Sequence, residues 1–309
     1  MSFDLPPDLR ARIETLAAVQ SHSSMRQRSA DLTSAYGEGA SSSSVNVAAY
    51  LTARMPATYA AVSSVFHEVG HLMPDFAPES ALDIGAGPGT AALAAQNLWP
   101  SLKVFELVER DERFAATAAQ LLPEAKLTQA PLQNVSSKAD LVVAAYVLAE
   151  LPEAEAASAA LKLWASAASV CIVIEPGTPQ GFARIRKVRD ALIKAGAQMI
   201  GPCTHQQACP MQGQNWCHFK VRLARSRLHM QAKGAVVPFE DEAFSWVAFA
   251  RKPVAKPRAR VVAPPTTTKF SVSLPLCTET GLATETFASR DKASYKQARK
   301  LNWGDGLNA

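Results

Sequence analysis

Long hydrophobic runs are missing from this chain of 309 residues. No stretch approaches the roughly 18 consecutive apolar residues that a membrane-spanning helix requires. The start of the chain carries Asp4 and Asp8 and no apolar segment, which argues against a secretory signal and a mitochondrial transit peptide. Cysteine is scarce, and in a reducing compartment the five present favour metal ligands or core residues over disulfides. We therefore expect a cytoplasmic monomer that makes no membrane contact.

Positive and negative charges are distributed unevenly along the chain. Residues 1–180 contain 11 Lys and Arg against 19 Asp and Glu, a formal charge of −8. From Gly181 to the end the counts are 21 and 8, a formal charge of +13. The acidic half suits a small cationic cofactor, and the basic half suits a polyanion such as nucleic acid, although polarised charge can also serve solubility alone.

Hydrophobic spacing predicts two structured regions before residue 200. Residues 1–75 show apolar side chains at helical intervals, at 9–28 and 47–72, and predict a helical N-terminal region. In residues 76–200 strands are expected at 81–84, 103–108, 126–129, 141–145 and 170–174, alternating with helices at 90–98, 113–122, 153–168 and 184–195. This alternation predicts an α/β domain with a Rossmann-like, doubly wound, mostly parallel sheet.

Residues 201–309 are less regular and are rich in cysteine and basic side chains. We expect them to complete the sheet with a strand at 244–250 and to add a small β-rich extension. That extension would include a strand at 270–276 and a helix at 293–301. The Pro- and Arg-rich segment 253–265 is interpreted as a linker or an extended basic arm.

The first expected strand runs into the turn Asp83-Ile84-Gly85-Ala86-Gly87-Pro88-Gly89. Closely spaced glycines at a strand end bring bare backbone beside a ligand. The spacing differs from the dinucleotide fingerprint G-x-G-x-x-G, because the sixth position counted from Gly85 is Thr90. The pattern D-x-G-x-G-x-G resembles motif I of the class I S-adenosylmethionine-dependent methyltransferases, in which the turn wraps the methionine part of the cofactor. The carboxylate of Asp83 suits the ammonium group of such a cofactor; the alternative is a tight loop without a ligand.

Glu109 follows the second expected strand, 20 residues after Gly89. A carboxylate at that strand end can accept hydrogen bonds from both ribose hydroxyls. The alternative is a solvated side chain beside Arg110 and Asp111. We assign cofactor binding to Asp83, Gly85, Gly87, Gly89 and Glu109. The catalytic residues stay unknown, because residues 145–148, after the fourth strand, contain no Asn-Pro-Pro-Tyr clamp for a methyl acceptor.

Four cysteines in the basic half form a candidate metal site: Cys203, Cys209, Cys217 and Cys277. Four thiolates suit either a tetrahedral zinc ion or a cubane iron–sulfur cluster. The spacing C-x5-C-x7-C matches neither a zinc ribbon nor a bacterial ferredoxin, and His205 or His218 can replace one thiolate. The alternative is a set of small buried residues. Cys171, inside an expected apolar strand, is assigned to the core.

The segments around these cysteines carry a family resemblance. They read Pro202-Cys203-Thr204-His205, Cys209-Pro210, Asn215-Trp216-Cys217-His218-Phe219 and Pro238-Phe239-Glu240-Asp241-Glu242, with Glu175-Pro176-Gly177 before them and Tyr295-Lys296-Gln297-Ala298-Arg299-Lys300-Leu301 after them. Over roughly residues 45–309 the chain resembles the methyltransferase-like proteins associated with the mitochondrial small ribosomal subunit, and their bacterial relatives.

The resemblance implies a class I methyltransferase fold whose partner is the small ribosomal subunit or its rRNA. It also implies a [4Fe-4S] cluster on Cys203, Cys209, Cys217 and Cys277, which we favour over zinc. Three functions follow: an S-adenosylmethionine-dependent rRNA methyltransferase, a non-catalytic assembly factor that binds RNA, and a small-molecule methyltransferase. The +13 half disfavours the last of these.

Two further patterns are weaker. Nine basic residues between Arg222 and Arg260 alternate with aromatic ones, including Phe219 and Trp246, which suits contacts to phosphates and bases. The alternative is a solvated face with core aromatics. The segment His67-Glu68-Val69-Gly70-His71 spells the H-E-x-x-H of a zinc peptidase, but we interpret its histidines as ordinary helix residues because no third ligand is framed downstream.

Overall fold

A computed structural model describes residues 3–17 and 46–308. Its N-terminal region is helical, with α1 (Pro7–Ala17), α3 (Val47–Ala49), the π-helical turn η2 (Tyr50–Arg54) and α4 (Met55–Leu72). Asn46 starts this run by accepting a hydrogen bond from the backbone N–H of Ala49 on its side chain, at 3.0 Å. The helical pattern expected over 9–28 extends beyond the described residues.

Strands and helices then alternate along the chain. The strands are β1 (Ser80–Ile84), β2 (Val104–Val108), β3 (Lys126–Thr128), β4 (Ala139–Ala145) and β5 (Ala167–Pro176). The helices are α5 (Thr90–Leu98), α6 (Glu112–Leu121), α7 (Ala156–Ser166) and α8 (Pro179–Lys194), with the 3-10 turns η3 (Leu132–Asn134), η4 (Leu148–Glu150) and η5 (Glu153–Glu155) between them. The five strands pair in parallel in the order β3-β2-β1-β4-β5.

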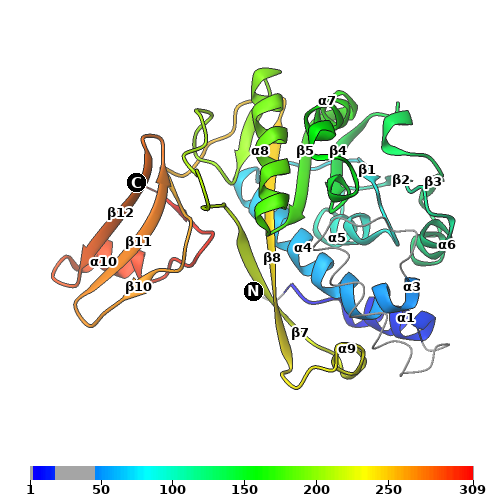
Figure 1. The fold of residues 1–309 in the computed structure, drawn as a ribbon, viewed down its shortest axis with the longest axis horizontal. Helices are drawn as coiled ribbons and strands as arrows, with labels where there is room; N and C mark the ends of the chain where they lie inside the picture. Colours follow the sequence, from blue (N-terminus) through cyan, green and yellow to red (C-terminus); the bar gives the residue numbers. More distant parts are fainter. Residues whose placement is uncertain (1–2, 18–45, 309) are drawn as a thin grey trace.

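Helices cover both faces of this sheet (Figure 1). Successive side chains of one strand point to opposite faces, so they divide between two cores. Leu141 and Val143 of β4 pack in the core that contains α4, α5 and α6, whereas Val142 and Ala144 pack in the core that contains α7 and α8. This arrangement confirms the predicted doubly wound, mostly parallel α/β fold.

The far edge of the sheet is built from later strands. The twelve-residue strand β8 (Phe239–Ala250) runs antiparallel to β5. Along its other edge it pairs antiparallel with β6 (Gln198–Gly201) at one end and with β7 (Phe219–Ala224) at the other. A short helix, α9 (Arg227–Lys233), connects β7 to β8. One antiparallel strand inserted beside the fifth parallel strand gives the order of the class I methyltransferase fold.

A second sheet stands beside this edge (Figure 1). It contains β9 (Ala259–Val261), β10 (Thr266–Thr267), β11 (Ser271–Thr278), β12 (Gly281–Ala288) and β13 (Gly306–Leu307), with α10 (Lys292–Ala298) packed on it. The interpretation of 253–265 as a linker or arm was therefore wrong for its centre. Val261 of β9 is fully buried and pairs with Leu276 of β11, so this segment forms core.

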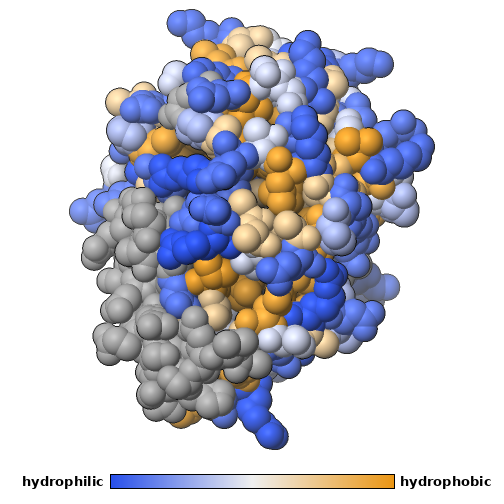
Figure 2. Space-filling model, turned by 90° about the vertical axis from the view of Figure 1, so that its right-hand side faces the viewer, coloured by the Kyte–Doolittle hydropathy of each residue, from blue (hydrophilic) through white to orange (hydrophobic). Residues whose placement is uncertain are grey.

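The surface on the side of β3 and α6 is mostly hydrophilic, and its hydrophobic residues gather near the middle (Figure 2). Within residues 3–17 and 46–308, no helix is both long and apolar enough to cross a membrane.

Candidate functional site

The glycine turn after β1 has a backbone that side chains would disturb. The φ angle is +68° at Gly85, +54° at Gly87 and +84° at Gly89, all in the left-handed region that favours glycine. A Cβ at position 85 would also stand 2.3 Å from Cγ2 of Val147, in the loop after β4. Gly89 is the N-cap of α5. The turn therefore packs its bare backbone directly against the end of the neighbouring strand.

Asp83 lies beneath this turn, inside the core, and not on the wall of the adjoining cleft. Its side chain accepts a hydrogen bond from the backbone N–H of Ala92, at 3.1 Å, in the first turn of α5. Burial raises the pKa of Asp83 to about 7, the N–H of Ala92 opposes that rise, and the negative charge of Glu109 adds to it. In the structure Asp83 thus fixes the start of α5 against the glycine turn.

Glu109 lies at the carboxyl end of β2 and faces the turn. One carboxylate oxygen accepts a hydrogen bond from the N–H of Gly87 and the other from the N–H of Asp111, each at 2.8 Å. A carboxylate has about four lone-pair positions, so both oxygens can still accept ligand hydroxyls. Only 7% of Glu109 is exposed, and its exposed part lines the cleft.

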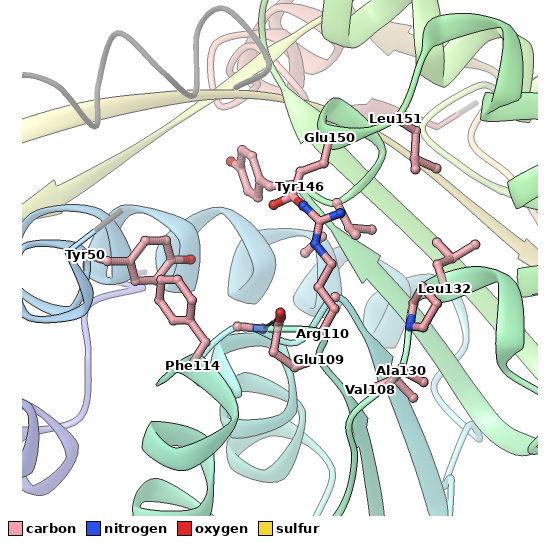
Figure 3. A pocket seen from close by; sticks show the side chains of 15 residues that line it. Tyr50, Val108, Glu109, Arg110, Phe114, Ala130, Leu132, Tyr146, Glu150 and Leu151 are labelled. Atoms are coloured by element: carbon pink, nitrogen blue, oxygen red, sulfur yellow. Dashed lines mark hydrogen bonds and ion pairs between the residues drawn. The ribbon is translucent and has the colours of Figure 1, made fainter. Parts of the chain in front are cut away.

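A cleft opens at the carboxyl ends of β1, β2 and β4, the edge of a parallel sheet where ligands of α/β proteins bind. Gly85, Gly87 and Glu109 line it together with aromatic and aliphatic side chains. Figure 3 shows Arg110 extending from the end of β2 toward Glu150, and their charged groups are 2.8 Å apart. The structure therefore brings three of the five residues assigned to the cofactor onto one wall.

Sequence reasoning missed the aromatic part of this cleft. Tyr50, from the π-helical turn, and Phe114 of α6 line it with their rings in edge contact, 5.1 Å between centroids (Figure 3). Tyr146 lines it from the end of β4 with φ at +62°, an unusual angle for a residue other than glycine. The one available signal was position: Tyr146 stands where an acceptor clamp was sought.

Tyr146 belongs to a buried network that was also missed. Its hydroxyl donates a hydrogen bond to Glu242 of β8, at 3.0 Å. Arg54 donates to the same carboxylate through both terminal nitrogens, and its guanidinium lies 5.1 Å from the centroid of the Tyr146 ring. Burial, followed by the charge of Glu242, raises the pKa of Tyr146 well above its usual value. The phenol therefore stays protonated and acts as a donor.

The four cysteines come together from separate segments. Cys203 and Cys209 lie in the loop after β6, Cys217 lies just before β7, and Cys277 lies in β11. Burial raises the pKa of Cys217 well above its usual value, and the other three thiols add to that rise. Among the described residues, no three His, Cys, Asp or Glu side chains form a group that could hold a metal ion. The thiols thus lie close enough to influence one another electrostatically but do not form a group that could hold a metal ion.

The surroundings of the four thiols act on their charge in opposite directions. Burial raises the pKa of Cys277 to about 12 and the neighbouring thiols add to it, whereas Arg189 and Arg260 lower it. Arg189 is 2% exposed and donates to the carbonyl groups of His205 and Gln207, which holds the loop in place. Four thiols with two guanidinium groups beside them fit the donor chemistry of a thiolate-bound centre.

Cys171 behaves differently from these four. It is buried in β5, and burial raises its pKa to about 12. It packs in the core shared by α7 and α8, as expected.

Most of the basic tract between Arg222 and Arg260 is engaged inside the protein, which corrects its interpretation as a phosphate-binding surface. Phe219 and Trp246 are buried, and the guanidinium of Arg251 lies 3.7 Å from the centroid of the Trp164 ring. Arg222 pairs with Asp241 and Arg258 with Glu285 at the surface, whereas Arg225 and Lys233 form largely buried ion pairs with Glu240. The alternative, core aromatics beneath a charged face, describes these residues.

Arg260 explains the peptidase-like segment. It is 2% exposed and pairs with Glu68 of α4 at 2.5 Å, while donating to the carbonyl groups of Pro202 and Gly304. His67 of the same helix packs on the ring of Phe3, with centroids 5.2 Å apart. The glutamate that a peptidase would need as a base is thus committed to an ion pair.

Comparison with known proteins places most of the chain in one family. A family model described as "Mitochondrial small ribosomal subunit Rsm22" matches residues 44–308. The human "Ribosome assembly protein METTL17, mitochondrial" is 28% identical over 285 residues, covering 84% of this chain and 61% of the relative. The Schizosaccharomyces pombe "Rsm22-cox11 tandem protein 2, mitochondrial" is 25% identical over 321 residues, covering 84% and 42%. The chain thus spans about half the length of these relatives.

Solved structures with the same type of fold are more distant in sequence. A putative RNA methyltransferase from Pyrococcus horikoshii is 16% identical, with a TM-score of 0.44, covering 64% of this chain and 86% of its own. A magnesium protoporphyrin IX methyltransferase from Synechocystis with bound S-adenosylmethionine is also 16% identical, with a TM-score of 0.41, covering 62% and 79%.

Proposed function

The chain belongs to the family of the mitochondrial small ribosomal subunit protein Rsm22, and from that premise we propose that it binds S-adenosylmethionine and acts on or with the small ribosomal subunit. The observation that carries the cofactor assignment is the contact between Glu109 and Gly87, because it joins the acid at the end of β2 to the glycine turn on one wall of a cleft. The partner rests on the family and on the human relative, which is named a ribosome assembly protein.

In this proposal each side chain of the cleft has a distinct task. The backbone of Gly85 and Gly87 borders the methionine part, and the free lone pairs of Glu109 accept the ribose hydroxyls. Tyr50 and Phe114 supply apolar surface, and Asp83 acts indirectly by fixing the start of α5. The excess of acidic residues in 1–180 favours a positively charged ligand.

Calorimetric titration with S-adenosylmethionine tests this site. We expect one binding site per chain in the wild type, and at least about tenfold weaker binding for Glu109→Ala, equivalent to ~1.4 kcal/mol. Glu112→Ala is the matched control, because this exposed glutamate stands three positions later at the start of α6 and should leave the affinity unchanged. Absence of binding heat from the folded wild type would refute the cofactor assignment.

We also propose that Cys203, Cys209, Cys217 and Cys277 hold a [4Fe-4S] cluster, with zinc as the alternative. The thiols gather from the loop between β6 and β7 and from β11, and Arg189 and Arg260 oppose the rise that burial causes in the pKa of Cys277. When bound, such a cluster ties the cysteine-rich loop to the second sheet through iron–thiolate bonds. Anaerobic purification followed by iron, sulfide and zinc analysis decides between the two. Cys209→Ser should lose the metal and Cys171→Ala, in the core of β5, should keep it.

Methyl transfer separates an rRNA methyltransferase from a non-catalytic assembly factor. The proposed assay incubates this protein with tritiated S-adenosylmethionine and small-subunit particles from cells that lack it. Incorporation into rRNA that Glu109→Ala abolishes supports the enzyme. Binding to the particles without incorporation supports the assembly factor.

We further propose that the protein is a cytoplasmic monomer. Light scattering tests the oligomeric state and cell fractionation tests the location; the relatives named above are mitochondrial proteins.

A further inference from the structure

Two cavities meet at Trp303, in the segment between α10 and β13. The first is lined by Trp216 and His218 of the cysteine-rich loop and by apolar side chains of β11 and β12. The second is lined by Lys220 of β7 and His71 of α4. Together they form a trough, which we call the Trp303 trough, at the junction of the two sheets seen in Figure 1.

The aromatic rings of the trough are held in a fixed arrangement. Trp216 and His218 stack with centroids 5.1 Å apart and an interplanar angle of 18°, and Trp303 meets His218 edge-on at 4.7 Å. The indole N–H of Trp216 donates to the carbonyl of Gly177 at 2.9 Å, which anchors the stack on the main sheet. Pre-positioned rings of this kind bind a further flat ring at little entropic cost.

Polar and charged groups surround the rings. The ammonium group of Lys220 lies 5.4 Å from the centroid of the Trp303 ring. The indole N–H of Trp303 is buried and finds no acceptor among the residues that the structure describes. Residues 251–309, which include Trp303 and the second sheet, contain eleven Lys and Arg against four Asp and Glu.

We propose that the Trp303 trough binds a nucleotide of single-stranded RNA. The base stacks on the aromatic rings, and the adjoining phosphate lies near Lys220. Residues 251–309 keep a net positive charge when the ion pairs of Arg258 and Arg260 are set aside, and that charge complements RNA. This inference rests on the proposed function and gives its ribosomal partner a specific point of contact, separate from the cofactor cleft.

Fluorescence anisotropy with a labelled single-stranded RNA decamer, on the full chain, tests the trough. We expect Trp303→Ala to weaken binding by about 5- to 100-fold, as loss of one base-stacking ring does elsewhere. Trp303→Phe keeps a ring and should recover most of the affinity. Lys220→Gln should weaken binding of every sequence and lower the salt dependence by about one ion. Trp216 and His218 are left unchanged because they flank Cys217.

Two controls distinguish the trough from any aromatic or basic surface. Phe270→Ala removes an aromatic side chain of the second sheet that is 69% exposed, and Lys138→Gln removes an exposed lysine just before β4. Both should leave RNA affinity unchanged. Ultraviolet cross-linking of RNA to the unmodified protein, mapped by mass spectrometry, gives a reading that needs no variant. The cross-link should fall on Trp303 or Trp216.

The outcomes separate this inference from the function on which it rests. If the wild type binds S-adenosylmethionine and RNA, but Trp303→Ala binds RNA equally well or the cross-link maps elsewhere, the trough is refuted and the proposed function stands. If the wild type binds neither ligand, both are refuted. Retained S-adenosylmethionine affinity in Trp303→Ala, with lost RNA affinity, supports the trough.

Discussion

The cofactor cleft and the basic half, which carries the four cysteines, are held together by contacts of different sequence separation. The cleft depends on contacts between neighbours along the chain, such as that of Glu109 with Gly87, 22 positions apart. The cysteine-rich half depends on distant partners, and the contact of Arg260 with Glu68 spans 192 positions. A motif with fixed spacing can be recognised before folding, whereas a contact between distant elements exists only after the sheet edge has assembled.

Charge shows the same contrast. In the acidic half, Asp83 and Glu109 are buried at the turn, and their spacing along the strands was enough to single them out. In the basic half, charge composition suggested an open phosphate-binding surface, but Arg222, Arg225 and Arg258 form ion pairs within the protein. Composition therefore predicts which partners a region can attract, and only the fold tells which charges remain available.

The largest effect expected in this comparison is that of Arg260→Met. Removing this buried guanidinium leaves Glu68 and two backbone carbonyls without their donor, and should lower the free energy of unfolding by roughly 3–5 kcal/mol, the usual cost of breaking one side of a buried ion pair. Urea denaturation measures it. Arg258→Met breaks the exposed pair with Glu285 on the same sheet and should cost at most about 1 kcal/mol. Equal losses for both would show that the two halves are not joined through Arg260.

Next in size is Gly85→Ala in the other half. Its Cβ would overlap Val147 and would hold an alanine at φ +68°, so we expect a loss of about 2–4 kcal/mol from strain and overpacking. Gly196→Ala is the matched control, because Gly196 has φ +82° but no atom within 4 Å of the added methyl, and should cost about 1 kcal/mol. Thermal unfolding compares the two. If Gly85→Ala lost no more stability than Gly196→Ala, contact with Val147 would not be the reason that position 85 requires glycine.

These residues show which features of the structure could be predicted from the sequence. The parallel strands and the glycine turn were predictable because hydrophobic period and glycine spacing are local. The strand β7 alternates buried and exposed residues from Phe219 to Ala224, a period of two that was available in the sequence but was obscured by its basic side chains. The strand β9 was hidden by surrounding prolines, and Tyr146 with Glu242 carried no local signal at all, since their contact spans 96 positions.

The free energy of unfolding should depend on pH because of Asp83, the buried acid beneath the glycine turn. The pKa of Asp83 is about 7 in the folded chain against 3.8 in the unfolded chain, so its contribution is fully present below pH 4 and is lost as the pH rises toward 7. Asp83→Asn keeps an acceptor for Ala92 without titrating. Between pH 5 and 7, unfolding in urea should show the variant gaining about 2 kcal/mol relative to the wild type. Parallel stability curves for the two proteins would contradict a buried, protonated Asp83.

The smallest effect tests a network that joins the acidic and basic halves of the chain beside the cleft. Tyr146→Phe removes the hydroxyl that donates to Glu242 but leaves the ring in the cleft and the Arg54 ion pair intact. Because Arg54 still neutralises the carboxylate, we expect a loss of only about 0.5–1.5 kcal/mol in urea denaturation, the usual net value of one hydrogen bond. A double-mutant cycle with Glu242→Gln isolates the contribution of the pair. A loss above roughly 3 kcal/mol for Tyr146→Phe alone would mean that the phenol, and not the guanidinium, holds β8 to the end of β4.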